Sequence, residues 1–337
     1  MKLFVYEHIT SGALIDESLP DSLAHEGNQM LLAIIGDFTQ LANLELTILR
    51  DVRLQSLSEF NHHCDIIKDT ASFQDKYAQA VNQADFILLI APETNNILSN
   101  LQRDLHDAKA TVLGCKIQAT ALCSDKYHCY KTLISSSINT PETLMASDFS
   151  ATSFDADNGY IVKPYDGAGC IDTQSITNKH NLLYWLANSE PDILNPLIIQ
   201  AKKLGESLSL SLLYSEQDVV VLAINQQHIK QQQGEIHFTG STVNADISNI
   251  FSLSQAYTLA MEVHQAIAGL WGLVGIDIIV NDSEVSVIDI NPRVTSSYIG
   301  LHQSIGLNPA ELLLTMNNQS IADLPVITQR LPIEVSL

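Results

Sequence analysis

An acid-bearing hairpin near the C-terminus constrains the fold more than any other stretch of this chain. Residues 276–280 and 285–290 are two apolar runs separated by a polar turn at 281–283. Two such runs joined by a short polar connection are typical of a β-hairpin. Asp277 lies within the first run, and Asp289 and Asn291 close the second. A carboxylate among Ile and Val is costly to bury unless something pairs with it, so these positions require a partner.

The three side chains of this hairpin offer oxygen ligands to such a partner. Asp289 and Asn291 are two residues apart, so they share one face of a strand. Divalent cations such as Mg²⁺ prefer carboxylate and amide oxygens. The spacing therefore predicts a metal site at Asp277, Asp289 and Asn291, with Arg293 as a cation beside it. Taken alone, these residues allow several uses of a divalent cation.

The bulk properties narrow the class of protein. A chain of 337 residues with 46% hydrophobic content is long enough for two or three domains and a well-buried core. Its net charge of −21 argues against a nucleic-acid or membrane partner, because both would be repelled. Five cysteines without paired spacing, and the absence of a secretory or membrane-spanning run, predict a reduced chain in the cytoplasm.

Strands and helices alternate in the first third of the chain, which predicts a parallel sheet covered on both faces. Ligands of such sheets bind beyond the carboxyl ends of the strands, here residues 7–8, 51–53 and 91–93. These groups either line a cleft or serve only as turns. The last third is richer in strands and predicts an α+β unit with antiparallel sheets. The predicted strands are residues 2–6, 44–49, 86–91, 112–114, 160–163 and 197–200, and the predicted helices are 22–38, 125–134, 181–188, 253–270 and 309–317.

A lysine followed by a glycine loop is the second strong signal. The strand at 160–163 directs Lys163 inward, and a loop of small residues follows at 166–170. Gly167 and Gly169 lack a Cβ, so backbone N–H groups there can approach phosphate oxygens closely. The loop matches neither the P-loop nor the dinucleotide pattern. A lysine that points into a core needs an anion; the alternative is a surface lysine beside an ordinary turn.

Three weaker signals complete the set. Lys126 begins a predicted helix and by itself reads as a solvated lysine. Residues 196–209 form a strand with a polar connector, which either presents backbone groups to a flat heterocycle or only links two strands. Cys123, His128 and Cys129 could form a zinc site, as could residues 61–64. Because no second ligand pair follows at the spacing of a zinc finger, buried thiols are the favoured reading.

The order of these segments resembles that of the ATP-grasp superfamily of carboxylate–amine ligases, over roughly residues 113–320. The resemblance implies a fold that combines α/β and α+β parts. A Rossmann-like pre-ATP-grasp domain with a parallel sheet would span residues 1–112. A lid subdomain with the glycine loop would span 113–199, and a C-terminal subdomain with the adenine connector and the metal site 200–337.

The same resemblance implies roles for individual residues in binding ATP and a metal ion. Lys126 and Lys163 would hold the α- and β-phosphates, and Gly167, Ala168 and Gly169 would fold over the β- and γ-phosphates. Adenine would contact Gln200, Ala201 and Lys203, chiefly through the backbone, and ribose would contact Glu206 or Ser207. Mg²⁺, or Mn²⁺ in its place, would bind Asp277, Asp289 and Asn291. The catalytic residues would be Lys163 and Arg293.

The whole chain is similar to the tyramine–glutamate ligase group, as residues 1–26, 50–53, 90–93 and 291–298 indicate. That group joins glutamate to an aromatic amine in methanofuran biosynthesis, and its relatives act in synthesis of the related methylofuran. The similarity implies small-molecule carboxylate and amine substrates, an acyl phosphate intermediate, and leaves a homodimer open. The alternatives are a ligase for another amino acid or peptide, a phosphotransferase, and a non-catalytic nucleotide-binding protein.

Overall fold

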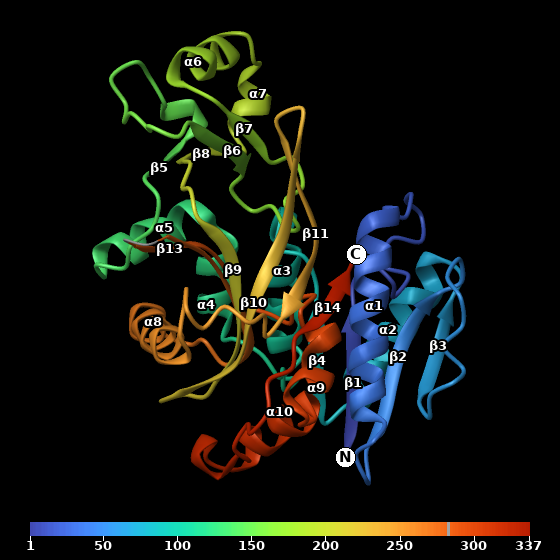
Figure 1. The fold of residues 1–337 in the computed structure, drawn as a ribbon. Helices are drawn as coiled ribbons and strands as arrows, with labels where there is room; N and C mark the ends of the chain where they lie inside the picture. The colour runs from blue at the N-terminus through green and yellow to red at the C-terminus, as the bar shows by residue number, and fades with distance from the viewer. Residues whose placement is uncertain (282–283) are drawn as a thin grey trace.

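The structure, a computed structural model, describes residues 1–281 and 284–337. The described part contains a four-stranded sheet near the N-terminus and a ten-stranded sheet built from the rest of the chain. Figure 1 shows the N-terminal unit beside the larger one, with a small helical and stranded lid at the far end of the latter. None of the described helices combines the length and the apolar character needed to cross a bilayer.

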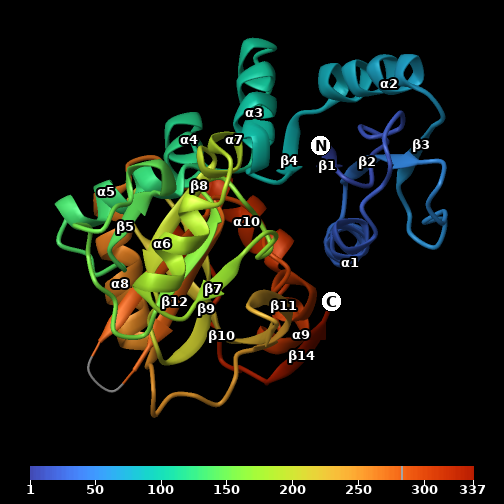
Figure 2. The ribbon, with the colours of Figure 1, turned by 90° about the horizontal axis from the view of Figure 1, so that it is seen from above.

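The N-terminal sheet is parallel throughout, as the alternating pattern predicts. Alternate side chains of its first strand enter two different cores: Leu3 and Val5 pack with helix α1, while Phe4 and Tyr6 pack with helix α2. Figure 2 shows these two helices on opposite sides of the sheet. The strands lie in the order β3-β2-β1-β4, and the bounds are β1 Lys2–Glu7, α1 Asp21–Phe38, β2 Glu45–Asp51, β3 His63–Ile67, α2 Thr70–Gln83, β4 Phe86–Ile90, η1 Thr94–Asn96 and α3 Ile97–Asp107.

Two predictions for this sheet are wrong. The strand predicted at 112–114 is a single bridge between Val112 and Ile87, and the fourth strand is β3, which the sequence analysis had not assigned. Strand β3 lies at the edge of the sheet and pairs only with β2. Because several of its side chains remain accessible, it lacks the continuous apolar run that marked the other strands.

The lid, residues 143–201, consists of short antiparallel strands with helices on the outside. Its own small core contains Phe149, Tyr160, Leu182 and Ile199. The two helices that precede the lid, within residues 117–135, pack in the core of the C-terminal unit. The predicted elements at 125–134, 160–163, 181–188 and 197–200 are all present. Their bounds, with their neighbours, are α4 Ile117–Ser124, α5 Lys126–Ser135, β5 Thr143–Met145, η2 Ala146–Asp148, β6 Tyr160–Pro164, β7 Gln174–Ile176, α6 Lys179–Ala187, α7 Pro191–Leu194 and β8 Leu197–Ala201.

The C-terminal unit contains the hairpin predicted from its acidic residues. Its two strands, β12 and β13, are antiparallel, and Asp277 lies opposite Asp289. Of the predicted turn, only Asn281 is described; residues 282–283 lie outside the described part. The helix predicted at 253–270 ends at Ala266, and an additional helix, α9, follows the hairpin. The bounds are β9 Glu206–Tyr214, β10 Val219–Gln232, β11 Glu235–Val243, α8 Leu253–Ala266, β12 Gly272–Val280, β13 Val285–Asn291, α9 Tyr298–Ile305, α10 Pro309–Asn318, η3 Ile321–Asp323 and β14 Ile333–Ser336.

Candidate active site

A cavity of about 410 Å³ lies where the lid, the C-terminal sheet and helix α1 meet. Nearly all of the site residues predicted from the sequence line it, although they come from positions up to 167 residues apart in the chain, from Lys126 to Arg293. Ala168 and Glu206 are the two that do not line it. Those that do are Lys126, Lys163, Gly167, Gly169, Gln200, Ala201, Lys203, Asp277, Asp289, Asn291 and Arg293.

The hairpin brings two carboxylates together at the floor of the cavity. The side chain of Asp277 accepts hydrogen bonds from Gln227 Nε2 at 2.9 Å and from Asn291 Nδ2 at 3.1 Å. Burial and the neighbouring charge of Asp289 raise the pKa of Asp277 to about 6. Burial also opposes the charge of Asp289, but Lys126 and Lys163 outweigh it and lower the pKa of that carboxyl. The arrangement concentrates negative charge in one place.

Two lysines face this acidic pair from different elements. Lys126 is the first residue of α5, whose N-terminus is capped by the Asp125 side chain, and its Nζ lies 2.5 Å from Asp289 Oδ2. Burial disfavours its charge, but Asp289 more than compensates and raises the pKa of Lys126. Lys163, on strand β6, is only 8% exposed, so the reading of it as a surface lysine is wrong.

Lys163 lacks the direct partner that Lys126 has. None of the ion pairs within 4 Å among the described residues includes it. Burial lowers the pKa of Lys163, the charge of Asp289 offsets this only in part, and Lys126 adds repulsion. A buried ammonium group without a direct partner is matched best by a bound anion.

The glycine loop after β6 is held from two sides. Lys126 N donates to Tyr165 O at 2.8 Å, and Asn95 N, in the segment after β4, donates to Asp166 Oδ2 at 2.8 Å. Gly169 has a φ of +64°, a left-handed conformation that glycine adopts without strain. Both glycines of the loop face the cavity, whereas Ala168 between them does not.

The connector between β8 and β9 forms another wall. Gln200 Nε2 donates to Thr143 Oγ1 at 3.2 Å, so its amide nitrogen is engaged within the lid. Lys203 Nζ lies 2.7 Å from Glu284 Oε1. Glu206 is exposed and accepts from Gln226 Nε2, whereas Ser207 lines the cavity. Adjacent residues of a strand point to opposite sides, so the geometry favours Ser207 over Glu206 for a ribose contact.

Arg293 is fixed by a carboxylate from the N-terminal unit. Its Nε lies 2.8 Å from Glu93 Oε1 and its Nη2 lies 2.9 Å from Glu93 Oε2. Burial disfavours the charge of the guanidinium, but Glu93 outweighs this effect and raises the pKa of Arg293. Of the three predicted strand ends, 91–93 therefore contacts a site residue, because Glu93 binds the guanidinium of Arg293. None of the three lines the cavity among the described residues.

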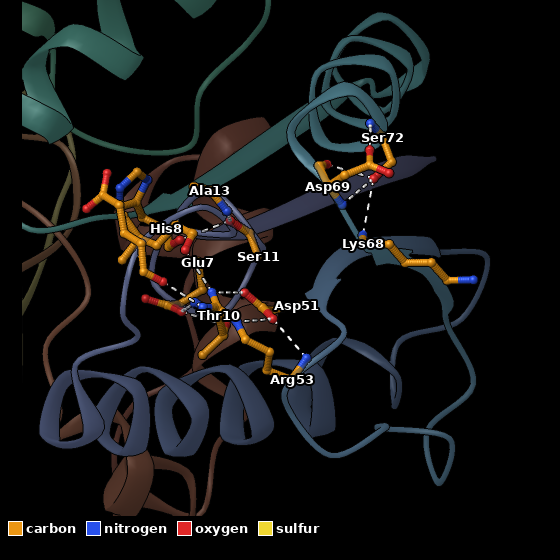
Figure 3. A network of polar contacts seen from close by, with 12 residues as sticks. Glu7, His8, Thr10, Ser11, Ala13, Asp51, Arg53, Lys68, Asp69 and Ser72 are labelled. Carbon is orange, nitrogen blue, oxygen red and sulfur yellow. Dashed lines mark hydrogen bonds and ion pairs between the residues drawn. The ribbon is translucent and has the colours of Figure 1, made fainter.

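The other two strand ends form a separate polar network. Figure 3 shows Glu7, Thr10, Asp51 and Arg53 joined by hydrogen bonds at the end of the parallel sheet. Glu7 is buried and accepts from Thr10 N at 2.7 Å and from Ile9 N at 3.2 Å. These residues serve to fix the loop that leads into α1.

Several polar residues of the cavity were not predicted from the sequence, among them Gln227 and Glu26. Gln227 lies on β10 beside an irregularity in its pairing with β11 and donates to Asp277. Glu26 lies on α1, in the N-terminal unit, and also lines the cavity. Neither residue interrupts an apolar run, so the sequence offered no signal comparable to a charge within a buried strand.

The zinc sites considered from the sequence are not formed. Cys123 and Cys129 are buried in the core of the C-terminal unit, while the ring of His128 pairs with Asp125 at the surface. No three His, Cys, Asp or Glu side chains gather at metal-binding distance within the described residues. The thiols are therefore packing residues.

The chemistry of the donor set at the hairpin fits a hard divalent cation. Asp277, Asp289 and Asn291 supply oxygen atoms at one end of the cavity, and Mg²⁺ uses one or two protein carboxylates together with phosphate oxygens. Burial, followed by repulsion from Asp289, raises the pKa of Asp277. A divalent cation between the two carboxylates would remove that repulsion, so these residues could hold it.

The sheet arrangement and the lysine-lined, acid-floored cavity define an ATP-dependent enzyme of the ATP-grasp class. Residues 123–297 match the ATP-grasp domain, and residues 44–120 match the pre ATP-grasp 3 domain. The chain belongs to the ATP-grasp family, and the predicted fold class is confirmed. It follows that the protein is an ATP-dependent ligase that uses a divalent metal ion.

Two relatives identify the group within this family that the chain resembles. A tyramine–L-glutamate ligase from Methanocaldococcus fervens is 29% identical over 322 residues, which are 95% of each chain. Another, from Methanocaldococcus jannaschii, is 26% identical over 303 residues, or 89% of this chain and 85% of that one. The resemblance inferred from the sequence is confirmed.

A solved structure shows the same fold. An ATP-grasp superfamily protein from Archaeoglobus fulgidus superposes with a TM-score of 0.70 at 24% identity. The match covers 93% of this chain and 88% of that one.

Proposed function

We propose that this protein joins the γ-carboxylate of glutamate to the amine of tyramine or tyrosine, with hydrolysis of ATP to ADP and phosphate. Two relatives at 29% and 26% identity are named tyramine–L-glutamate ligases. The observation that carries the proposal is the buried Lys163, which is in none of the ion pairs between described residues and lies close to the two carboxylates of the hairpin. A bound anion would balance the charge of Lys163, and a divalent cation would balance the two carboxylates, so the site favours an anion and a cation that bind together.

We assign each proposed site residue to one part of ATP or to the metal ion. Lys126 and Lys163 hold the α- and β-phosphates, and the loop with Gly167 and Gly169 covers the β- and γ-phosphates. The backbone of Gln200 and Ala201 receives adenine, with Lys203 beside it, and Ser207 replaces Glu206 as the ribose contact. Asp277, Asp289 and Asn291 hold the metal. When bound there, Mg²⁺ would neutralise charge on the β- and γ-phosphates.

The reaction requires little covalent chemistry from the protein. An oxygen of the substrate carboxylate attacks the γ-phosphorus, ADP leaves, and an acyl phosphate forms. The amine nitrogen then attacks the acyl carbon, phosphate leaves, and the nitrogen loses a proton. Positioning and charge neutralisation supply most of the acceleration. Arg293 stabilises the transferred phosphoryl group, and the glycine loop keeps water from the acyl phosphate.

The wider role stays a prediction as well. We assign the reaction to the biosynthesis of methanofuran or methylofuran, which are one-carbon cofactors, in the cytoplasm. The boundaries at 112 and 199, Mg²⁺ rather than Mn²⁺, and a homodimer belong to the same prediction.

The test is a screen for ADP release with purified protein, ATP and Mg²⁺. Glutamate is offered with tyramine, with tyrosine and with other amines, and each substrate is also offered alone. We expect release that depends on both glutamate and an aromatic amine. A different preferred pair would indicate a ligase for another amino acid or peptide. A phosphorylated product without an amine would indicate a phosphotransferase, and ATP binding without turnover a non-catalytic protein.

A Lys163→Ala variant tests the site within the same screen. We expect kcat/KM to fall at least about 100-fold, because a preorganised cation aimed at developing charge contributes on that scale. Lys131→Ala is the control, since Lys131 is exposed and lies over the ring of Tyr127. Full activity of Lys163→Ala would contradict the assignment of the phosphate site.

A further inference from the structure

Helix α1 contributes one carboxylate to the cavity that the proposed reaction has not used. Glu26 is half-buried and lines the cavity, although it belongs to the N-terminal unit. The other carboxylates of the lining, Asp277 and Asp289, are engaged with the hairpin and with Lys126. Glu26 forms none of the ion pairs within 4 Å found among the described residues.

Arg293, the cation whose charge acts on Glu26, already forms an ion pair with another carboxylate. Arg293 affects the carboxylate through its charge, but its guanidinium is bound in a two-pronged contact by Glu93. Among the described residues, hydrogen bonding from the side chain of Ser296 also favours the charged form of Glu26. The charged form of Glu26 is therefore stabilised, but no cation of the described residues forms an ion pair with it.

Packing holds Glu26 in this position. The next residue, Gly27, faces the buried carboxylate of Glu7: a Cβ on Gly27 would lie 2.8 Å from Glu7 Cδ. Helix α1 can therefore approach the end of β1 closely, and Glu7 is itself fixed by hydrogen bonds from Ile9 and Thr10. The place of the α1 backbone at residues 26–27 is therefore set by a close contact.

The carboxylate of Glu26 lies close to the glycine loop. A Cβ built on Gly169 would lie 4.0 Å from Glu26 Oε2. Gly169, Ser296 and Arg293 thus lie around it. Of these, Gly169 and Arg293 are placed at the transferred phosphoryl group in the proposed function. Burial raises the pKa of Glu26, an effect that Arg293 and Ser296 oppose and Glu93 reinforces. A cation bound there would compensate for that burial.

We infer that Glu26 binds the ammonium group of the amine substrate and holds it next to the acyl phosphate. The inference rests on the proposed function and assigns the amine side of that site. ATP and the carboxylate substrate are anions, so a carboxylate without an ion partner repels them, whereas a primary amine arrives as a cation. Its place beside the glycine loop favours the reacting amine over the α-ammonium group of glutamate.

Glu26 acts in binding, and the chemistry of the transfer is unchanged. The bound ammonium group first loses one proton to solvent. The nitrogen lone pair then attacks the acyl carbon, the bond between that carbon and the phosphate oxygen breaks, and phosphate leaves. Loss of the second proton from nitrogen yields the neutral amide.

The experiment compares the wild type with Glu26→Gln, which keeps the size of the side chain and removes its charge. ADP release is followed against amine concentration at saturating ATP and glutamate, and then against each of the other substrates. We expect the KM for the amine to rise about 10- to 100-fold, the range for a hydrogen bond to a charged group. The KM values for ATP and glutamate should change less than about twofold. His25→Gln, an exposed neighbour on the same helix, is the control.

Hydroxylamine separates amine binding from a structural role. It is uncharged near neutral pH and traps acyl phosphates as hydroxamates. With ATP, glutamate and hydroxylamine, Glu26→Gln should form hydroxamate at the rate of the wild type. Glu26→Asp, which keeps the charge on a shorter arm, should recover part of the affinity for the amine.

Three results would overturn the inference. They are an unchanged KM for the amine in Glu26→Gln, an equal loss of rate with hydroxylamine, and a rise confined to the KM for glutamate. The last would place the α-ammonium group of glutamate on Glu26. Absence of hydroxamate with the wild-type protein would instead refute the proposed function, and this inference with it.

Discussion

The carboxylate of Asp51 holds the loop between β1 and α1 against the parallel sheet. Arg53 Nε lies 2.9 Å from Asp51 Oδ1, and the same guanidinium donates to Glu17 O at 2.6 Å and to Leu14 O at 2.8 Å. Figure 3 shows the pair beside Thr10, whose carbonyl accepts from Asp51 N at 2.8 Å. One side chain thus links the end of a strand to the segment that positions α1.

This contact predicts a stability that depends on pH. Burial opposes the charge of Asp51, but hydrogen bonds and charge from Arg53 outweigh it and lower the pKa of the carboxyl. A carboxyl with a lowered pKa stabilises the fold above its unfolded pKa, and that stabilisation is lost as the pH falls through the folded value. Asp51→Asn should therefore reduce the free energy of unfolding by about 1–2 kcal/mol near neutral pH. The penalty should shrink below about pH 4.

Urea denaturation at the two pH values measures this difference. The exposed Asp107→Asn variant is the control and should change the stability by less than about 0.5 kcal/mol at either pH. An equal penalty for Asp51→Asn at both pH values would show that the charge of Asp51 is not the cause.

The sequence predicts a role in the site for some residues and not for others. Lys163, Asp277 and Asp289 stood out because each is a charge within a strand of apolar residues, and burying such a charge requires a partner. The sequence assigns no role to Glu26, and it places Glu93 only in a strand end that either lines a cleft or serves as a turn, because polar residues are ordinary on a helix surface or after a strand. Their importance depends on which distant element packs against them, and local pattern does not contain that information.

At the scale of elements, two glycines of α1 provide a matched pair of substitutions. A Cβ on Gly27 would meet the carboxyl group of Glu7, which hydrogen bonds hold in place, whereas a Cβ on Gly36 would lie 3.6 Å from Phe60 Cε1 in ordinary contact. Gly27→Ala should destabilise the fold by about 1–3 kcal/mol through overpacking. Gly36→Ala should stabilise it by about 0.5–1 kcal/mol, because alanine loses less entropy in a helix. Thermal and urea unfolding measure both.

If Gly27→Ala proved as stable as the wild type, Glu7 would have to move aside, and the close contact between α1 and β1 would not be rigid. The place of the α1 backbone beside the cavity would then not be fixed by this contact.

Elements with strong periodicity were predicted well, and short or accessible ones were not. The β12–β13 hairpin and α5 were identified because their patterns are complete within a few residues. Strand β3 lies at an edge with accessible side chains, and α9 has only eight residues, so neither presents a long pattern. Tertiary contacts stabilise such elements more than their own sequence does.

For the whole molecule, the segment after β4 is one link between the N-terminal unit and the cavity, in addition to helix α1. Glu93 binds Arg293, and Asn95 N binds Asp166 at the start of the glycine loop. Figure 1 shows β4 and α3 close to the C-terminal unit, while β2 and β3 lie farther out. The sequence predicted each unit, but it did not predict their relative placement, which rests on contacts such as the one between residues 93 and 293.

Breaking the ion pair between Glu93 and Arg293 should lower the free energy of unfolding much more than breaking a surface ion pair. Glu93→Gln leaves a buried guanidinium without its counter-charge, so the free energy of unfolding should fall by about 3 kcal/mol. Glu216→Gln is the control, because Glu216 and Lys116 are 68% and 62% exposed, and it should cost at most about 1 kcal/mol. Urea unfolding measures both variants. Equal losses would mean that Arg293 finds another partner.

The charges of the cavity and the charge of the whole molecule act on incoming substrates over different distances. Around the site, Lys126, Lys203 and Arg293 already have carboxylate partners at contact distance. A nucleotide therefore gains attraction from these three only by displacing their partners, whereas Lys163 is in none of the ion pairs among the described residues. Farther out, a net charge of −21 repels every anion, over a range of about 8–10 Å at physiological salt. Encounter with ATP is therefore slowed by the surface and eased by added salt, while its residence is decided by exchange of ion partners within the cavity. Arrival and retention of the nucleotide are thus governed by separate sets of residues.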